Sequence, residues 1–564
     1  MQLGFGIRAI ALGTAGLFAV AACGPTQQGG GITLAPNQEL RVNIGTEPAS
    51  LDPGQTQWVY EGAVDRQLFE APLKASKDFK SVVPAAADSY SVDSTGTIYT
   101  FKLHPGAKWS DGVAVKAADF VYGWQRLLDP RQAAPYSSFY TVVKNGAKVN
   151  GMDPKDTGID AALQTLGLKA VDDNTFQVTL DSAAGYFKWV ATLWTGAPIR
   201  KDVVAKAGKD SSGNDKWGAV AASAVTSVVG NGQFKVSEVL VKDHITLVQN
   251  TNYSGSAPKP TLTKITLKEI DDDAVAYAQY KSGELDIAGV PIANTQAVKD
   301  DPVLSKELVQ DPELTVFWVD INVKKAPFDN LKVRQAFAQA IDRDSYVKNV
   351  LKNRGYSSAT FIPKGMRDYN PSLGTGQAYD PTKAKASLQA SGLTADQLSS
   401  MNIKYTYNSN SATSKTIAQF IADQLKTNLG VTLVLDGADS KTNSKRLHTG
   451  NYQIGGPSGW GADYPDEQDW YDIFITGSGN QFSSWSNASY DKAVNDADAA
   501  ADQSKRDTLY NQAGKILVDE APVIFLNQRT RWALVKSYVK GVTDLPNDDF
   551  PGDFYIYTVQ IAQH

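Results

Sequence analysis

Strand-like and helix-like hydrophobic patterns alternate along most of this chain. Apolar residues at every second position predict strands, whereas spacings of three and four predict helices. The strand-like segments cover residues 40–44, 99–103, 176–180, 245–247, 265–267, 431–435 and 523–525. The helix-like segments cover residues 337–341, 417–425 and 509–517. Because the two kinds interleave without an internal repeat, we predict an α/β chain whose domains exchange the polypeptide more than once.

Size and composition narrow the class of protein. A chain of 564 residues is long enough for more than one domain. Hydrophobic residues make up 42% and charged residues 20%, which is typical of a folded globular protein rather than a disordered or many-helix membrane protein. The net charge of −5 gives no electrostatic support for a nucleic-acid partner.

The N-terminus has the pattern of an export signal. Arg8 precedes an apolar run at 9–20, and Ala21 and Ala22 stand before Cys23, which is the only cysteine. The run is too short for a permanent membrane span, so we predict a signal peptide over residues 1–22. Residues 20–23 resemble a bacterial lipobox, which predicts that Cys23 is lipidated and holds the protein at the outer face of the cytoplasmic membrane. The alternative is ordinary secretion with a free thiol.

Residues 23–37 follow the expected cleavage site and include the stretch GPTQQGGG. This stretch lacks core-forming side chains, so we expect a flexible tether there, with the folded domain starting near residue 38.

Motifs for catalysis are missing from the sequence. The four histidines stand far apart, and none of HExxH, GxSxG, GxxxxGK[ST] or GxGxxG occurs. We therefore expect no enzyme activity, cofactor or metal site. The acidic run at 271–273 lacks the spacing of an EF-hand, and we expect it to begin a helix instead.

Several segments form a recognisable set, and the two clearest are ADFVYGWQRL at 118–127 and WGADY at 460–464. The others lie at 47–53, 66–70, 109–112, 231–234, 280–286 and 326–343. Together they resemble family 5 extracellular solute-binding proteins, in particular the oligopeptide-binding receptor lipoproteins of bacterial ABC importers. The resemblance implies a periplasmic-binding-protein-like fold of type II, a large three-lobed "Venus flytrap" with discontinuous domains. It also implies a monomer whose partners are an oligopeptide, an ABC permease and an ATPase.

The resemblance implies a division into lobes as well. Lobe I would combine residues 38–70, 195–314 and 520–564, lobe II would cover 71–194, and lobe III would cover 315–519. The ligand would be enclosed between lobes I and III.

Seven residues are expected at the ligand. By the resemblance, two segments pair with the peptide backbone, and Asp463 accepts a hydrogen bond from the α-ammonium group of the ligand. The segments are Gln57, Trp58 and Val59 in the first and Gly459, Trp460 and Gly461 in the second. Glycines at 459 and 461 would allow a close backbone approach.

The sequence also departs from the short-peptide binders of this family. Pro457 stands where those proteins have an arginine for the ligand carboxylate, and Leu351 and 413–414 replace their other cations. A fixed, short peptide length is therefore not favoured. The leading hypothesis is an oligopeptide receptor; the alternative is the same fold with an oligosaccharide, a metal chelate or a signalling peptide as cargo.

Overall fold

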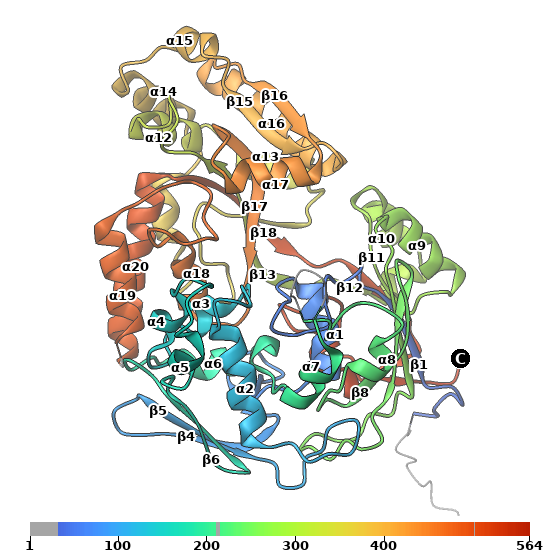
Figure 1. Cartoon of the computed structure of the whole chain (residues 1–564). Coiled ribbons are helices and arrows are strands. Elements are labelled where there is room, and N and C mark those ends of the chain that lie inside the picture. Colours follow the sequence, from blue (N-terminus) through green and yellow to red (C-terminus); the bar gives the residue numbers. More distant parts are fainter. Residues whose placement is uncertain (1–31, 210–214, 501) are drawn as a thin grey trace, which may run out of the picture.

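The computed structural model describes residues 32–209, 215–500 and 502–564, and the predicted signal peptide and Cys23 lie outside this part. Three large sheets organise the described chain (Figure 1). All are covered by helices or loops from several stretches of sequence, so the predicted α/β class is confirmed.

The seven-stranded sheet lies at the right of Figure 1 and includes the first strand of the described chain. Its order is β12 (Leu308–Val309), β19 (Ala533–Val535), β11 (Ile287–Gly289), β1 (Glu39–Asn43), β10 (Lys264–Lys268), β9 (His244–Gln249) and β8 (Phe234–Leu240). The central strand β1 runs parallel to β10 and β11. The helices in the same part of the chain are α1 (Val59–Leu68), α7 (Lys201–Ala207), α8 (Ala224–Ser227), α9 (Asp273–Ser282), α10 (Thr295–Asp300) and α11 (Leu304–Glu307). Asp272 caps α9, as expected for the acidic run.

The four-stranded sheet lies at the bottom of Figure 1 and is antiparallel throughout. Its order is β4 (Ala87–Val92), β5 (Ile98–Leu103), β7 (Thr175–Thr179) and β6 (Leu168–Asp172). Five helices lie above it: α2 (Ala117–Leu128), α3 (Ser137–Tyr140), α4 (Gly146–Asn150), α5 (Ile159–Leu163) and α6 (Phe187–Val190). A small hairpin of β2 (Leu73–Ala75) and β3 (Val82–Pro84) precedes it.

The six-stranded sheet forms the upper part of the molecule (Figure 1). Its order is β14 (Gly355–Ser357), β18 (Val523–Thr530), β13 (Pro312–Ile321), β17 (Ile454–Gly461), β15 (Lys404–Asn408) and β16 (Val434–Ala438). The helices around it are α12 (Leu331–Gln339), α13 (Arg343–Asn349), α14 (Pro381–Ala390), α15 (Ala395–Ser400), α16 (Ala412–Leu429) and α17 (Ser440–His448). Below it follow α18 (Gln468–Tyr471), α19 (Ala488–Asp498) and α20 (Gln503–Glu520), of which the last two pack against each other.

The chain passes between the seven-stranded and six-stranded sheets at two places. Strand β12 leads into β13 through residues 310–311, and β18 leads into β19 through residues 531–532. A hydrophobic cluster confined to residues 319–526 packs part of the upper sheet, and the large cluster of the two lower sheets extends into the same sheet through Val316, Trp318 and Phe525. Two short connections between two sheets are an arrangement that allows hinge motion.

Strand β18 differs from the expected division into lobes. The sequence analysis assigns residues 520–564 to lobe I, but β18 pairs with β13 and β14 in the six-stranded sheet. A buried apolar strand carries no signal for the sheet that it joins, because its partners are far away in sequence. The last crossing therefore lies near residue 531 rather than 520.

Most predicted elements lie where the periodicity places them. The exception is the segment at 431–435, because β16 begins only at Val434. The expected tether also ends earlier than residue 37, since Leu34 bridges to Ala562 and the Ala35 N–H donates to the Ile561 carbonyl. No helix in the described part of the chain is both long and apolar enough to cross a membrane.

Candidate functional site

Asp463 lies directly after β17, where three different parts of the chain meet. Its Oδ1 accepts a hydrogen bond from the Tyr136 hydroxyl at 3.0 Å, and its carbonyl accepts one from the Asn547 side chain at 3.3 Å. Its Oδ2 is buried and has no hydrogen-bond partner among the described residues. Burial raises the pKa of Asp463 to about 7, although Tyr136 and Arg66 act in the opposite direction. The free oxygen leaves room for one cationic donor.

A second carboxylate, Asp469 of α18, lies beside Asp463. Its Oδ2 accepts the Asp463 N–H at 2.9 Å and lies 3.4 Å from Nε1 of Trp460. Burial and the Asp463 carboxylate raise the pKa of Asp469 well above its usual range. Two adjacent carboxylates cannot both ionise easily, so we infer that Asp469 keeps its proton when Asp463 ionises. Asp469 was not among the predicted site residues, because its position six residues after Asp463 was its only signal in the sequence.

Strand β17 presents an unpaired edge next to this anchor. It pairs with β13 on both sides of an irregularity at residues 456–457, but with β15 only through Ile454 and Gly455. The Ala462 N–H donates to the Leu314 carbonyl, so these two opposite residues are a hydrogen-bonded pair. In an antiparallel ladder, hydrogen-bonded pairs alternate with non-hydrogen-bonded pairs. Gly459 and Gly461 fall at the non-hydrogen-bonded positions, so their N–H and C=O groups point to the open edge. An extended peptide can pair with that edge.

Both glycines also have a packing role. A Cβ atom at Gly459 would lie 2.7 Å from Cδ1 of Phe317, and one at Gly461 would lie 3.0 Å from Oγ1 of Thr315. Glycine is therefore required at 459 by the facing strand, besides leaving the open edge free of side chains.

The segment of Gln57, Trp58 and Val59 is arranged differently from β17. Val59 is the first residue of helix α1, and Gln57 and Trp58 belong to no strand. The N–H groups of Gln57 and Trp58 both donate to Oε2 of Glu61, at 2.8 and 3.0 Å. The Gln57 carbonyl lies 3.2 Å from the Tyr136 hydroxyl, and the Trp58 carbonyl accepts the Gly62 N–H. These backbone groups are already satisfied, whereas the side chains of Trp58 and Val59 are exposed.

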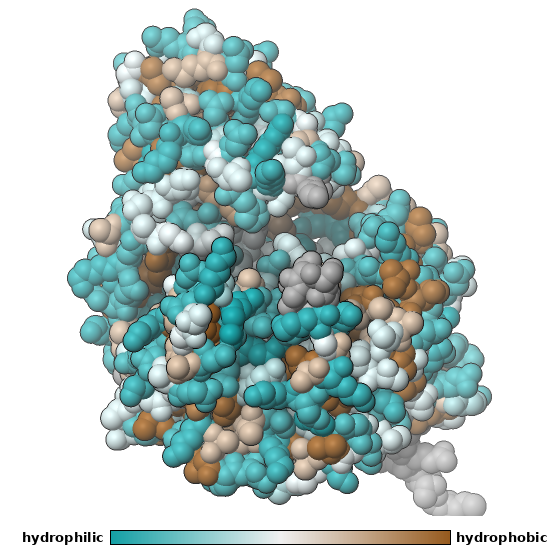
Figure 2. Space-filling model, in the orientation of Figure 1, coloured by the Kyte–Doolittle hydropathy of each residue, from teal (hydrophilic) through white to brown (hydrophobic). Residues whose placement is uncertain are grey.

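The structure brings the two predicted segments together through Tyr136. This buried side chain contacts Gln57 on one side and Asp463 on the other. Of the positions that carry cations in the short-peptide binders, Leu351 is buried in the upper hydrophobic cluster, whereas residues 413–414 lie in the first turn of α16, where the Ser411 side chain accepts the Ser414 N–H. Figure 2 shows a hollow between the upper part of the molecule and the lower parts.

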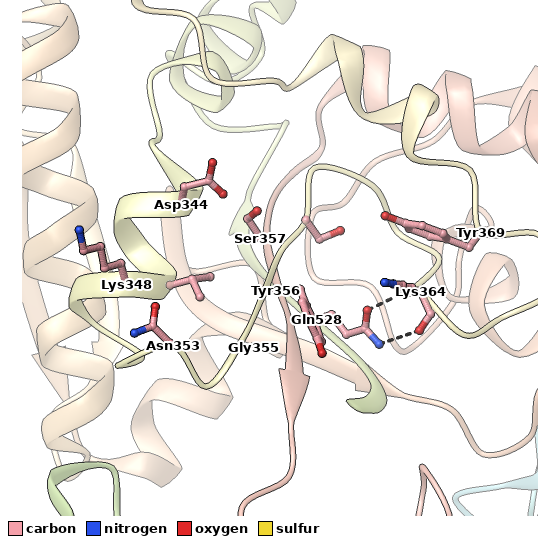
Figure 3. A pocket seen from close by; sticks show the side chains of 11 residues that line it. Asp344, Lys348, Asn353, Gly355, Tyr356, Ser357, Lys364, Tyr369 and Gln528 are labelled. Atoms are coloured by element: carbon pink, nitrogen blue, oxygen red, sulfur yellow. Dashed lines mark hydrogen bonds between the residues drawn. The ribbon is translucent and has the colours of Figure 1, made fainter. Parts of the chain in front are cut away.

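A separate cavity of about 560 Å³ lies at the opposite edge of the six-stranded sheet, beside β14 and α13 (Figure 3). Asp344, Lys348 and Lys364 give it a polar lining, and two hydrogen bonds join the Gln528 side chain to the backbone of Lys364. None of the seven predicted ligand residues lines it. In the described part of the chain, no group of three His, Cys, Asp or Glu residues could hold a metal ion.

Comparisons with known proteins give matches over most of this chain. The model of the bacterial extracellular solute-binding proteins, family 5 Middle, matches residues 81–482. The periplasmic oligopeptide-binding protein OppA of Salmonella typhimurium is 31% identical over 95% of this chain and 94% of its own. The oligopeptide-binding protein OppA of Bacillus subtilis is 32% identical over 86% of each chain.

Solved structures match over nearly the whole chain. The Escherichia coli murein tripeptide binding protein MppA has a TM-score of 0.80 at 28% identity and covers 94% of this chain and 100% of its own. Haemophilus influenzae OppA in complex with the peptide RPPGFSPFR has a TM-score of 0.78 at 27% identity, with the same coverage.

Proposed function

Because this chain belongs to the family 5 bacterial extracellular solute-binding proteins, we propose that it is the oligopeptide receptor of an ABC importer. The fold is the type II periplasmic-binding fold that the sequence predicted, and proteins of this family bind substrates for transporters rather than catalyse reactions. The observation that carries the proposal for this chain is the buried, unpartnered Oδ2 of Asp463 at the end of the open edge of β17.

We assign two contacts to the peptide. Its α-ammonium group donates to Asp463, a charge-assisted hydrogen bond worth about 1.5–3 kcal/mol net. Its backbone pairs with Gly459 and Gly461, which makes recognition largely independent of side chains. From the opposite wall, Trp58 and Val59 contribute side chains rather than backbone groups, because Glu61 already binds the N–H groups of Gln57 and Trp58.

The two lobes are expected to close around the peptide, because the peptide contacts both of them. We propose that lobe I and lobe III move about residues 310–311 and 531–532. A peptide that touches both lobes only in the closed form shifts the population towards that form. The partners would be a permease and an ATPase that recognise the closed state.

Calorimetry with one pentapeptide in three forms tests this function. We expect the free peptide to bind, the N-acetylated peptide to bind weakly because it has no α-ammonium, and the C-amidated peptide to bind nearly as well as the free one. Equal affinity for the free and acetylated forms would remove Asp463 as the anchor. Binding of an oligosaccharide or a metal chelate with no peptide binding would favour the alternative cargo.

We also propose that Cys23 carries the lipid anchor. The first described residues pair with the C-terminal segment, so residue 32 leaves the folded body beside that end of the chain (Figure 1). Acyl labelling of the wild type and of Cys23→Ser checks this assignment. We expect the label only on the wild type; a labelled variant would contradict it.

A further inference from the structure

The arginines near Asp463 already have carboxylate partners. Burial raises the pKa of Asp463 and that of Asp549, a residue of the C-terminal segment, to about 7, and three nearby arginines act against this rise. They pair as Arg66 with Asp553 at 2.7 Å, Arg529 with Glu313, and Arg531 with Asp544. None of the three is therefore available to neutralise a further carboxylate fully.

Asp463 and Asp549 are two carboxylates in this region that form no ion pair with a described arginine or lysine. Oδ2 of Asp463 is buried and unpartnered. The carboxylate of Asp549 has no hydrogen bond or ion pair to any residue that the structure describes, although its N–H donates to Asp553 at 3.0 Å. Asp469 does not add to the count, because it holds a proton beside Asp463.

Asp549 lies close to the proposed ligand contacts. It is two residues after Asn547, whose side chain donates to the carbonyl of Asp463. It also lies near enough to Tyr60, the residue after Val59, to help raise the pKa of that hydroxyl to about 12. Unlike Asp553, Asp549 is only partly buried, so a ligand can reach it.

One α-ammonium group neutralises only one of these two carboxylates. A partly buried charge without a partner is costly, and a second cation next to the first would relieve that cost. Lysine and arginine side chains can supply such a cation at the end of a flexible stem.

We propose that Asp549 is a second cation subsite, and that the preferred ligands are oligopeptides with lysine or arginine as their first or second residue. This inference rests on the proposed function, because Asp463 must hold the α-ammonium group. Asp549 would then determine specificity, whereas Asp463 and β17 supply the contacts common to all peptides.

Calorimetry at pH 8 with a panel of pentapeptides tests the subsite. The parent is an alanine pentapeptide, and its variants carry lysine at position 1, 2 or 5, or the uncharged norleucine at the same positions. We expect lysine at position 1 or 2 to improve affinity about tenfold or more over norleucine, as for a close charge pair. Lysine at position 5 should give no gain.

Two charge-matched variants complete the design. Asp549→Asn should reduce the lysine-to-norleucine ratio to about one and leave the norleucine peptides within about twofold of wild type. Asp396→Asn removes one charge from exposed helix α15 at the far tip of the molecule and should keep the wild-type ratio (Figure 1).

The outcomes separate the two proposals. Equal binding of the lysine and norleucine peptides by the wild type overturns the subsite while the proposed function stands, and this comparison needs no variant to fold. A lysine preference that survives in folded Asp549→Asn also overturns it. If no peptide of the panel binds, the proposed function fails and the subsite fails with it.

Discussion

The two segments expected to bind the peptide backbone have opposite structures. Strand β17 leaves Gly459 and Gly461 facing an open edge, whereas the N–H groups of Gln57 and Trp58 are bound by Glu61 at the start of α1. Strand β17 therefore offers backbone groups, and residues 57–59 offer the exposed side chains of Trp58 and Val59. The two walls of one site can therefore have different roles: β17 binds the backbone of the peptide, and residues 58–59 contact the side chains of the peptide.

The largest effect should come from the anchor beside β17. Asp463→Ala should cost about 2–5 kcal/mol of binding free energy for free peptides, the range for truncating one partner of a buried charge pair. Calorimetry against Gln57→Ala sharpens the comparison, because that variant keeps the backbone groups and should change affinity little. Similar losses in the two variants would contradict the division between the walls.

Removing the charge of Glu61 tests whether this carboxylate keeps the N–H groups of Gln57 and Trp58 from binding a ligand. Glu61 accepts N–H groups from Ala49, Gln57 and Trp58 at 2.8–3.0 Å. The amide of Glu61→Gln presents only one acceptor oxygen, so we expect a loss of about 1–3 kcal/mol in the free energy of unfolding. Urea denaturation measures it, with the exposed Glu284→Gln as the control. A clear gain in peptide affinity in Glu61→Gln would mean that the freed N–H groups bind ligand after all.

Acid should weaken binding through the anchor. Burial holds the pKa of Asp463 at about 7 in the empty site, and only its ionised form attracts an ammonium group. As pH falls through 7, the empty site takes up a proton that the peptide must displace. The α-amino group of the peptide, whose pKa is about 7.7–8.0, gains charge over the same range and offsets part of this loss, so we expect affinity to fall about fourfold between pH 8 and pH 6. Calorimetry across this range checks it, and a constant affinity would contradict it.

The smallest effect should come from Asp469→Asn. Asparagine has the shape of the protonated aspartate that we place there, and its oxygen can still accept the Asp463 N–H. We expect peptide affinity within about threefold of wild type at pH 7, set against the large loss in Asp463→Ala. A loss as large as that of Asp463→Ala would show that Asp469 carries a charge of its own.

Local signals predicted more of the fold than of the site. The periodicity at 417–425 and 509–517 was enough for helices α16 and α20, because each buries one apolar face. Asp463 could be identified from the sequence because it belongs to the motif WGADY at 460–464. Tyr136, Asp469 and Asp549 could not, because their roles depend on contacts that only the folded chain creates; Tyr136 and Asp463 are 327 residues apart.

The start of helix α1 at Val59 has a signal in the sequence that the prediction did not use. Glu61 stands three residues after Trp58, the position from which an acidic side chain binds the N–H of the residue that begins a helix. Tryptophan is an unusual residue just before a helix, which weakens this signal. The sheet that β18 joins had no comparable signal.

Hydrogen–deuterium exchange with and without a saturating peptide tests the division between the walls most directly. The N–H groups of Gly459 and Gly461 should exchange rapidly in the empty protein and slow markedly on binding, because they gain partners on the open edge of β17. Those of Gln57 and Trp58 should be protected already and change little. Unchanged exchange at 459 and 461, or protection that appears at 57 and 58 instead, would contradict the account.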